Sequence, residues 1–446
     1  MKSIYDHSDT GNAELLNDLY GKDIRYDPKT DRWLQWKNGH RWFEVTEPEK
    51  FNLAIRTANH RFELAKDMAV EGAKREVSFA IRSRNLGSMQ NTLSVAQNLS
   101  PIGNHSVFWD NQPNLLVVGN GVVNLSNSAI RPGQRNDFLT QGIHMPYVSN
   151  SPAPTWEKFL RDITLGNEEL VSFIQRAIGY TLTGFTTAQV FFMLYGGGSN
   201  GKSVLINILN ELLEGFSRTI RFSAFEEAST SDAKRDLAEL PGIRVTFASE
   251  SGKKSALDTS IIKQITGGEP ITTSRKYGHP FTFKPQFKLW LTTNHLPKVD
   301  DDSLGFWRRL IIIPFDAIFE GSDRDDHMQQ KLEAELPGIL AWAVRGAAMW
   351  SKEGLNTPDS LLLKVSKYRE AADTYNNFME EMCIKKEGSI VRASILYEVY
   401  KVWCGQMNYS IASNAEFGKK MGERLERGHD RQGWYYSGVE LIMSLE

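Results

Sequence analysis

The feature that most constrains this chain is an apolar run that leads directly into a glycine-rich loop and then into an amphipathic helix. Residues 190–211 read VFFMLYGGGSNGKSVLINILNE, which is the strand, loop and helix order of a phosphate-binding loop. Its glycines let backbone N–H groups surround a phosphate, and the helix amino terminus adds a favourable dipole. We therefore expect bound ATP, with Lys202 reaching the β- and γ-phosphates and Ser203 holding Mg²⁺. The residues expected at the nucleotide are Gly196, Gly197, Gly198, Ser199, Asn200, Gly201, Lys202, Ser203 and Val204.

A second apolar run, residues 243–249, is followed at once by Glu250. Its composition predicts a buried strand beside the strand of the phosphate-binding loop. An acid at that position can hold Mg²⁺ or polarise the attacking water. Glu250 is therefore the candidate catalytic and metal-binding acid, although an ordinary strand followed by a solvated glutamate would give the same pattern.

Two further motifs carry polar groups at the ends of apolar runs. Asn294 follows the run 287–291, where an amide can orient the hydrolytic water. Arg308 and Arg309 precede the run 311–314. An arginine that enters a neighbouring subunit's ATP site can neutralise the charge of the transition state. A pair of solvated surface arginines is the alternative reading.

Between these motifs, two short strand-like runs flank a basic, aromatic turn. Residues 253–288 hold seven Lys or Arg against two Asp or Glu, inside a chain of net charge −2. Such a hairpin suits the phosphate backbone of DNA, although a solvated hairpin would have the same composition. The residues expected to contact DNA are Arg275, Lys276, Tyr277 and His279.

The remaining chain predicts three regions. Residues 1–150 combine aromatic strands around 24–45, basic helices within 50–85 and strand-like runs at 107–109, 115–118 and 122–125, which predicts an α+β domain. Residues 151–350 begin with a helical bundle and then alternate strand and helix signals, which is typical of an α/β core. Residues 351–446 form a linker and a small domain with two helices and a Trp-Tyr-Tyr strand, resembling a winged helix.

Composition limits where the chain works. Only Cys383 and Cys404 are present, with no paired Cys or His spacing, which argues against a zinc ribbon or a disulfide scaffold. No run of 18 uncharged apolar residues and no leader pattern occurs. We expect a soluble cytoplasmic protein without a membrane partner. In the carboxyl-terminal region, the basic residues that could touch phosphates are Lys419, Lys420, Arg424, Arg427 and Arg431.

The ordered motifs resemble the superfamily 3 helicase domain of phage and plasmid primase-helicases and their poxvirus relatives. The resemblance spans most of the chain from about residue 100, and no primase signature is found before residue 150. Within the core, the motifs that carry it are GGGSNGKS, VTFASE, KQITGGEPITTSRKYG, LTTNHLP and FWRRLIIIPF. Many relatives end the second motif with two acids, whereas here Ser249 precedes Glu250, which leaves open the group that contacts Mg²⁺.

The resemblance implies an AAA+-like fold, a hexameric ring with ATP sites between subunits, and 3′ to 5′ translocation on single-stranded DNA. It assigns the Walker A role to Lys202 and Ser203, the Walker B role to Glu250 and the sensor role to Asn294. It places Lys276 and its neighbours in the central channel, and it makes Arg308 or Arg309 the arginine finger.

We therefore expect a replicative, ATP-driven DNA helicase of a phage or similar element, working in the host cytoplasm. Its expected partners are single-stranded and forked DNA, further copies of the chain, and a primase or polymerase. The alternative is an ATP-switched initiator or loader that binds an origin and melts DNA without processive unwinding. A small-molecule kinase would share the phosphate-binding loop, but the arginine pair and the basic hairpin disfavour it.

Overall fold

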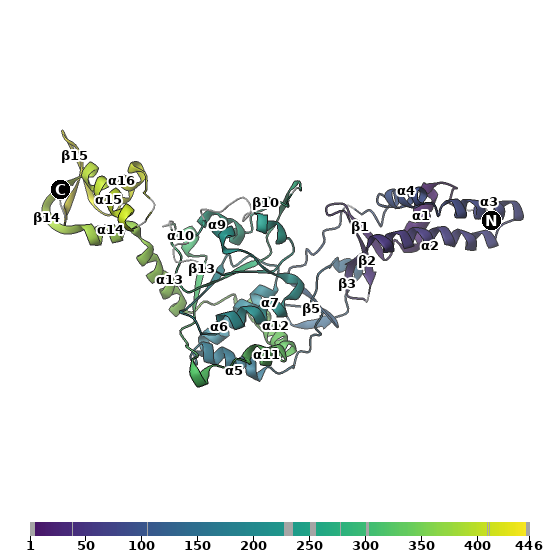
Figure 1. Cartoon of the computed structure of the whole chain (residues 1–446), viewed down its shortest axis with the longest axis horizontal. Helices are drawn as coiled ribbons and strands as arrows, with labels where there is room; N and C mark the ends of the chain where they lie inside the picture. Colours follow the sequence, from purple (N-terminus) through teal and green to yellow (C-terminus); the bar gives the residue numbers. More distant parts are fainter. Residues whose placement is uncertain are drawn as a thin grey trace.

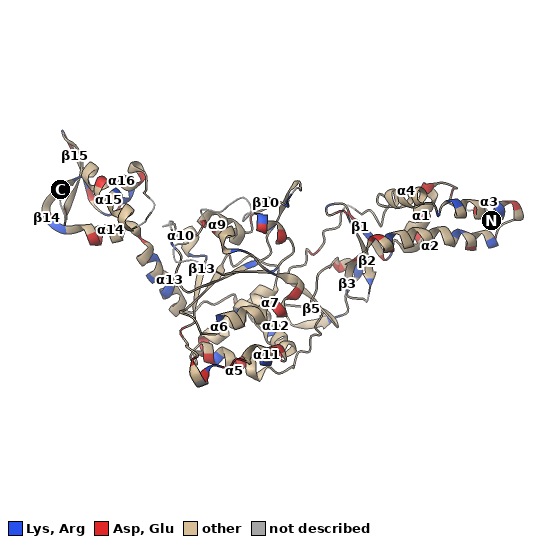
Figure 2. Ribbon diagram, viewed as in Figure 1, with Lys and Arg blue, Asp and Glu red and all other residues tan. Residues whose placement is uncertain are grey.

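A computed structural model describes residues 5–37, 39–104, 106–226, 235–249, 256–276, 278–299, 303–407, 409 and 411–442. The chain is elongated, with a helical amino-terminal part and a small carboxyl-terminal part at opposite ends of a central α/β part (Figure 1). Basic and acidic residues are interspersed along its length (Figure 2), in keeping with the net charge of −2.

The amino-terminal part combines helices with two small antiparallel sheets. Its helices are α1 (Asp9–Tyr20), α2 (Glu47–Lys66), α3 (Val70–Arg82) and α4 (Leu86–Ala96). One sheet contains β1 (Ile24–Asp27), β2 (Arg32–Lys37) and β3 (Arg41–Glu44). The other contains β4 (Leu115–Val118), β5 (Gly121–Asn124) and β6 (Ala129–Arg131). The predicted strand at 107–109 is wrong: Trp109 instead packs edge-on against the rings of Trp42 and Phe138, so aromatic contacts replace strand pairing.

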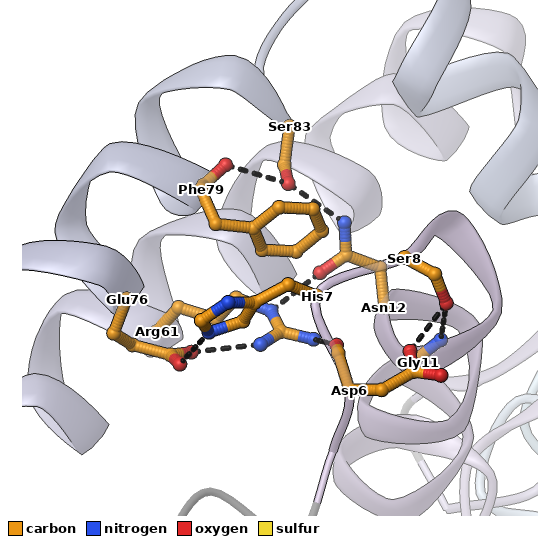
Figure 3. A network of polar contacts seen from close by, with 9 residues as sticks. All are labelled: Asp6, His7, Ser8, Gly11, Asn12, Arg61, Glu76, Phe79 and Ser83. Atoms are coloured by element: carbon orange, nitrogen blue, oxygen red, sulfur yellow. Dashed lines mark hydrogen bonds and ion pairs between the residues drawn. The ribbon is translucent and has the colours of Figure 1, made fainter. Parts of the chain in front are cut away.

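A buried polar network fixes the packing of α1, α2 and α3 (Figure 3). The Arg61 and Glu76 side chains are both fully buried and form an ion pair of 2.7 Å. Arg61 also donates to Asn12 Oδ1 at 2.6 Å, and His7 contacts the second Glu76 oxygen at 2.7 Å. A buried charge is tolerated only when it is paired and hydrogen-bonded. Arg61, one of the basic residues within 50–85, is thus a structural residue.

The central part is built on a five-stranded, wholly parallel sheet. Its strand order is β13-β7-β12-β9-β8. The strands are β7 (Phe191–Tyr195), β8 (Ser217–Thr219), β9 (Val245–Ser249), β12 (Lys288–Thr293) and β13 (Leu310–Pro314). A separate antiparallel hairpin contains β10 (Ile271–Ser274) and β11 (Pro280–Phe283).

Helices cover both faces of this sheet, which explains why its strands are continuous apolar runs. Phe192 and Leu194 of β7 point into one hydrophobic cluster, whereas Phe191 and Met193 point into another. The helices of the central part are α5 (Pro154–Ile163), α6 (Glu168–Leu182), α7 (Lys202–Leu212), α9 (Thr259–Gly267), α10 (Leu304–Trp307), α11 (Met328–Glu333) and α12 (Leu336–Glu353). The short 3-10 helices are η1 (Arg135–Asp137), η2 (Glu214–Phe216), η3 (Phe222–Phe225), η4 (Asp236–Glu239) and η5 (Gly321–Asp323).

Two buried cations join the sheet to its surroundings. Arg244, just before β9, donates to the carbonyl oxygens of Leu182 at 2.6 Å and Leu115 at 2.7 Å. Lys288, at the start of β12, donates to the carbonyl oxygens of Thr183 and, at 3.1 Å, Gln286. Burial lowers the pKa of Arg244 to about 10 and places that of Lys288 well below its ordinary value. Carbonyl dipoles from separate elements therefore replace water around both cations.

The carboxyl-terminal part follows the long helix α13 (Asp359–Ala372). Its helices are α14 (Thr374–Met382), α15 (Ala393–Met407) and α16 (Asn414–Gly422). Its antiparallel sheet has the order β14-β16-β15, from β14 (Cys383–Arg392), β15 (Glu426–Asp430) and β16 (Gly433–Leu441). A separate hydrophobic cluster that includes Phe378, Tyr400 and Trp403 holds this part together.

Candidate nucleotide-binding site

The predicted strand, loop and helix are formed by β7, residues 196–201 and α7. Gly196 has no room for a side chain, because an added Cβ would lie 2.4 Å from the Phe315 carbonyl oxygen. Gly201 has φ +86°, and its Cβ would lie 2.8 Å from Ile163 Cγ2. A left-handed conformation and close packing both favour glycine there. These contacts fix the loop directly before the first turn of α7.

Lys202 begins α7, and its ammonium turns back onto the loop. Nζ donates to the Gly196 carbonyl oxygen at 2.6 Å and to Asn200 Oδ1 at 3.1 Å. The Asn200 amide in turn donates to the Phe315 carbonyl oxygen at 3.0 Å, so the loop is tied to the end of β13. Burial lowers the pKa of Lys202 from its ordinary value, because a desolvated ammonium is disfavoured. An ammonium held by carbonyl oxygens is suited to bind an entering phosphate.

A cavity of about 630 Å³ opens over this loop. Its volume is in the range of small-molecule sites, which is roughly 300–1,000 Å³. It brings together Lys202 and Ser203 of α7 with Asn294, which follows β12, the strand paired with β7. The predicted residues that line it are Gly198, Ser199, Asn200, Gly201, Lys202, Ser203, Val204 and Asn294, whereas Gly196 and Gly197 are not among its lining residues.

The opposite wall of the cavity was missed from the sequence. It is formed by α5 and by the segment between β13 and α11. The charged residues there are Lys158, Asp162, Asp323, Arg324, Asp325 and Asp326. Several of these charges are already paired: Arg324 with Asp326 at 2.7 Å, and Lys331 with Asp325 at 2.6 Å. Hydrogen bonding from Lys331 lowers the pKa of Asp325. The run SDRDDH at residues 322–327, in the segment that links β13 to α11, was the available signal.

The position of the predicted acid strand needs a correction. β9 does not lie beside β7, because β12 is hydrogen-bonded between them. In register, Ser249 of β9 pairs with Thr292 of β12, so the carboxyl ends of these strands meet at the edge of the sheet that carries the loop. Glu250 itself lies outside the described residues. Asn294 follows the end of β12 and lines the cavity directly.

Oxygen ligands suit Mg²⁺, the metal predicted at this cavity, and several side chains of the cavity carry oxygen atoms. Ser203 is exposed and presents a hydroxyl to the cavity beside Lys202. The carboxylates of the opposite wall supply further oxygen atoms. Among the described residues, no group of three His, Cys, Asp or Glu is arranged to hold a metal ion by itself. The residues present therefore fit a cation that takes part of its coordination shell from a bound phosphate.

Arg308 and Arg309 lie where the parallel strands begin, whereas the phosphate-binding loop lies where they end. They precede β13, which runs parallel to β7 with Leu310 opposite Phe191, whereas the loop follows the far end of β7. Five residues of strand separate the two ends by about 15 Å. Arg308 is exposed and donates to Gln189 at 2.8 Å, and Arg309 donates to the Gly305 carbonyl oxygen. Burial lowers the pKa of Arg309. Neither arginine lines this chain's own cavity.

The basic turn is carried by the β10–β11 hairpin. Arg275, Lys276 and His279 are exposed at its tip, and the Arg275 guanidinium lies 5.9 Å from the centre of the Phe281 ring. Tyr277 lies outside the described residues. The hairpin leads into β12, so the same strand connects these cations with Asn294 at the cavity.

In the described parts of the chain, no helix is long and apolar enough to cross a membrane.

Three family models match the chain in order. "D5 N terminal like" matches residues 13–165, "Family of unknown function (DUF5906)" matches 194–309, and "Poxvirus D5 protein-like" matches 370–437. The first and third therefore flank the segment that contains the phosphate-binding loop. The order of the matches agrees with that of the three parts of the fold.

Viral proteins with related sequences cover a large part of the chain. "Putative helicase L207/L206" of Acanthamoeba polyphaga mimivirus is 26% identical over 418 residues, which cover 84% of this chain and 43% of that protein. "Putative helicase 184R" of Invertebrate iridescent virus 6 is 24% identical over 268 residues, which cover 56% of this chain and 27% of that protein. The chain thus spans less than half of the length of these relatives.

A solved structure shares the fold. The A form apo structure of the NrS-1 C terminal region (305–718) is 11% identical, with a TM-score of 0.51 over 97% of this chain and 100% of that one. Its similarity at this identity concerns the fold alone. The matched amino-terminal and carboxyl-terminal regions, together with the viral relatives, support a poxvirus D5-like family member.

Proposed function

We propose that the chain is an ATP-dependent DNA helicase of the superfamily 3 type, which works as a hexameric ring on single-stranded DNA with 3′ to 5′ polarity. The observation that carries this proposal is that the proposed catalytic residues lie at opposite ends of the strands of one sheet. Lys202, Ser203 and Asn294 share a cavity, whereas Arg308 and Arg309 lie at the opposite end. This arrangement leaves both arginines of the motif away from the chain's own cavity, and in the proposed ring one of them completes the site of a neighbouring copy.

In this proposal each residue has a defined task. Lys202 leaves the Gly196 carbonyl oxygen and binds the β- and γ-phosphates of ATP. Ser203 and Glu250 hold Mg²⁺, which when bound neutralises phosphate charge. Asn294 orients the attacking water from the tip of β12. Of the two arginines, Arg308 is the more exposed, and this supports its role as the residue that enters the neighbouring site.

The basic hairpin of the central part and the carboxyl-terminal part support a role on DNA. The β10–β11 hairpin presents Arg275, Lys276 and His279 toward solvent, as a segment lining a central channel requires. In the carboxyl-terminal part, the order α14-β14-α15-α16-β15-β16 and the sheet order β14-β16-β15 support the proposed winged-helix assignment. The viral relatives, named as helicases, agree with this function.

Replacement of the phosphate-binding lysine tests the proposal. The Lys202→Ala variant is expected to lose DNA-stimulated ATP hydrolysis by at least about a hundredfold, because removal of a preorganised charge at the reaction costs on the order of 10²–10³ in rate. Lys352→Ala, which removes an exposed lysine at the end of α12, is the matched control and should retain wild-type hydrolysis. Full DNA-stimulated hydrolysis in Lys202→Ala would overturn the assignment.

Strand displacement separates the proposal from the initiator or loader alternative. A helicase should unwind a forked duplex with ATP and Mg²⁺, and Lys202→Ala should leave the fork intact. An initiator would hydrolyse ATP in a Lys202-dependent manner and bind DNA but would not displace the strand. Particle images with an ATP analogue and single-stranded DNA would show whether six copies form the ring.

A further inference from the structure

The β15–β16 hairpin projects from the carboxyl-terminal part, at the end of the molecule away from the amino-terminal helices (Figure 1). In its antiparallel register, His429 pairs with Trp434 and Arg427 pairs with Tyr436. These four residues therefore share one face of the hairpin, since side chains alternate along a strand. Tyr436 is fully buried in the core of this part, whereas Trp434 is 49% exposed. The face changes from core to surface within two residues.

Trp434 is held in place by polar groups although it packs into no core. The Arg427 guanidinium carbon lies 3.9 Å from the centre of the Trp434 ring, and the His429 ring lies edge-on at 4.8 Å. A cation over an indole face is a favourable contact that fixes the orientation of the ring. About half of the Trp434 side chain stays open to solvent, so the hairpin presents a large, oriented aromatic surface that folding does not use.

The charges around this aromatic residue distinguish it from the rest of the basic carboxyl-terminal surface. Arg424 forms an ion pair with Asp373 at 2.7 Å, and Lys420 lies 3.6 Å from Glu423, so the fold already uses these two cations. Asp430 of the hairpin is bound through both carboxylate oxygens by Arg392 of β14, at 2.7 and 2.9 Å. The remaining arginines, Arg427 and Arg431, are exposed. An oriented indole therefore lies against the exposed Arg427, on a hairpin that also carries the exposed Arg431 and an aspartate that is already paired.

We propose that this hairpin is a second binding site for single-stranded DNA, with one base stacked on Trp434 and the backbone phosphates bound by Arg427 and Arg431. Single strands offer base faces to aromatic side chains, whereas a duplex presents only base edges in its grooves. The exposed ring thus favours an unpaired strand over a duplex. The inference rests on the proposed helicase function, because that function supplies the unpaired strand, but the binding itself requires no ATP.

The test measures the affinity of the full chain, without nucleotide, for a fluorescein-labelled oligothymidine of about 20 nucleotides, followed by fluorescence anisotropy. Loss of one stacked base predicts that Trp434→Ala binds about fivefold or more weakly. Trp434→Phe keeps an aromatic face and should stay within about twofold of wild type. The matched control is Ile390→Ala, which removes a 52% exposed apolar side chain from β14 of the same sheet and should also bind within about twofold. Thermal unfolding of each variant shows whether it is folded.

Salt dependence gives an independent readout of the phosphate contacts. Arg431→Ala should reduce the slope of log affinity against log salt by about 0.7, as expected for one phosphate contact on a single strand. Wild-type affinity in a folded Trp434→Ala variant would overturn the inference. A loss confined to a blunt duplex of the same length would also overturn it, since the hairpin would then read paired DNA. If Lys202→Ala abolishes hydrolysis while Trp434→Ala binds the oligothymidine normally, only this inference fails. If Lys202→Ala hydrolyses ATP normally while Trp434→Ala binds the oligothymidine weakly, only the helicase assignment fails.

Discussion

Two hairpins of this chain have similar chemistry and very different surroundings. Each is antiparallel and exposed, and each has an arginine over an aromatic ring: Arg275 at 5.9 Å from Phe281, and Arg427 at 3.9 Å from Trp434. The β10–β11 hairpin continues into β12, whose far end carries Asn294 at the nucleotide cavity. The β15–β16 hairpin belongs to a separate hydrophobic core beyond α13. Composition therefore identifies two basic, aromatic surfaces, whereas the connection to the sheet distinguishes them: in the proposed helicase, ATP can move only the hairpin that leads into β12.

The largest expected difference between the two hairpins is in the DNA stimulation of ATP hydrolysis. We expect the double variant Arg275→Ala and Lys276→Ala to lose DNA stimulation of ATP hydrolysis by roughly tenfold, because it removes the coupling through β12. The double variant Arg427→Ala and Arg431→Ala removes the same number of charges and should reduce the stimulation by less than about threefold. Steady-state hydrolysis at saturating DNA measures both. Equal losses in the two variants would contradict the assignment of coupling to the first hairpin alone.

A smaller effect is expected from adding a methyl group to each hairpin. In Gly428→Ala the new Cβ would lie 2.3 Å from the Tyr435 ring, so this ring must leave its place across the strand. Overpacking of this kind costs about 1–3 kcal/mol. In Gly278→Ala the Cβ would lie 3.5 Å from Arg275, an ordinary contact, and little change is expected. Thermal unfolding compares the two variants, and equal stability would mean that Tyr435 moves without cost.

The smallest effect concerns the base of the first hairpin, where Lys288 begins β12. Its pKa in the folded chain is well below the ordinary lysine value of 10.5, because burial disfavours the ammonium. Between these two pKa values the unfolded chain binds more protons than the folded chain, so this lysine makes folding more favourable as pH rises. The stability of wild type relative to Lys288→Met should therefore increase with pH up to about 10.5. Denaturant unfolding from neutral to alkaline pH measures this difference, and a flat or falling difference would contradict it.

Local order was predictable along most of the core. The apolar runs that became β7, β12 and β13 were visible because strands buried on both faces need no polar alternation. The loop glycines were equally clear, since Gly201 requires a left-handed conformation. The helical end of the central part is divided into α11 and α12, where Pro337 lies in the first turn of the second helix.

Long-range arrangement was not predictable in the same way. The insertion of β12 between β7 and β9 depends on pairing between strands that are distant in the sequence, and no local pattern encodes it. The acidic wall around Asp323 follows the last of the motifs and reaches the cavity only because β13 pairs with β7. In the sequence, Trp434 looks like any other aromatic residue of a strand. Its exposure could not be predicted, because the hydrophobic cluster of this part buries Tyr436 and leaves Trp434 at the surface.

Arg244 has a practical consequence for dissecting the chain. Its guanidinium, which is 4% exposed, depends on the Leu115 carbonyl oxygen, and a hydrophobic cluster of the central sheet also contains Leu116 and Val123. An expression fragment that begins at residue 151 would retain the phosphate-binding loop and every later motif. It would nevertheless remove one of the two carbonyl partners of a buried cation, at a cost of about 1–3 kcal/mol. A fragment that begins before Leu115 keeps both partners and is the sounder choice for isolating the central part.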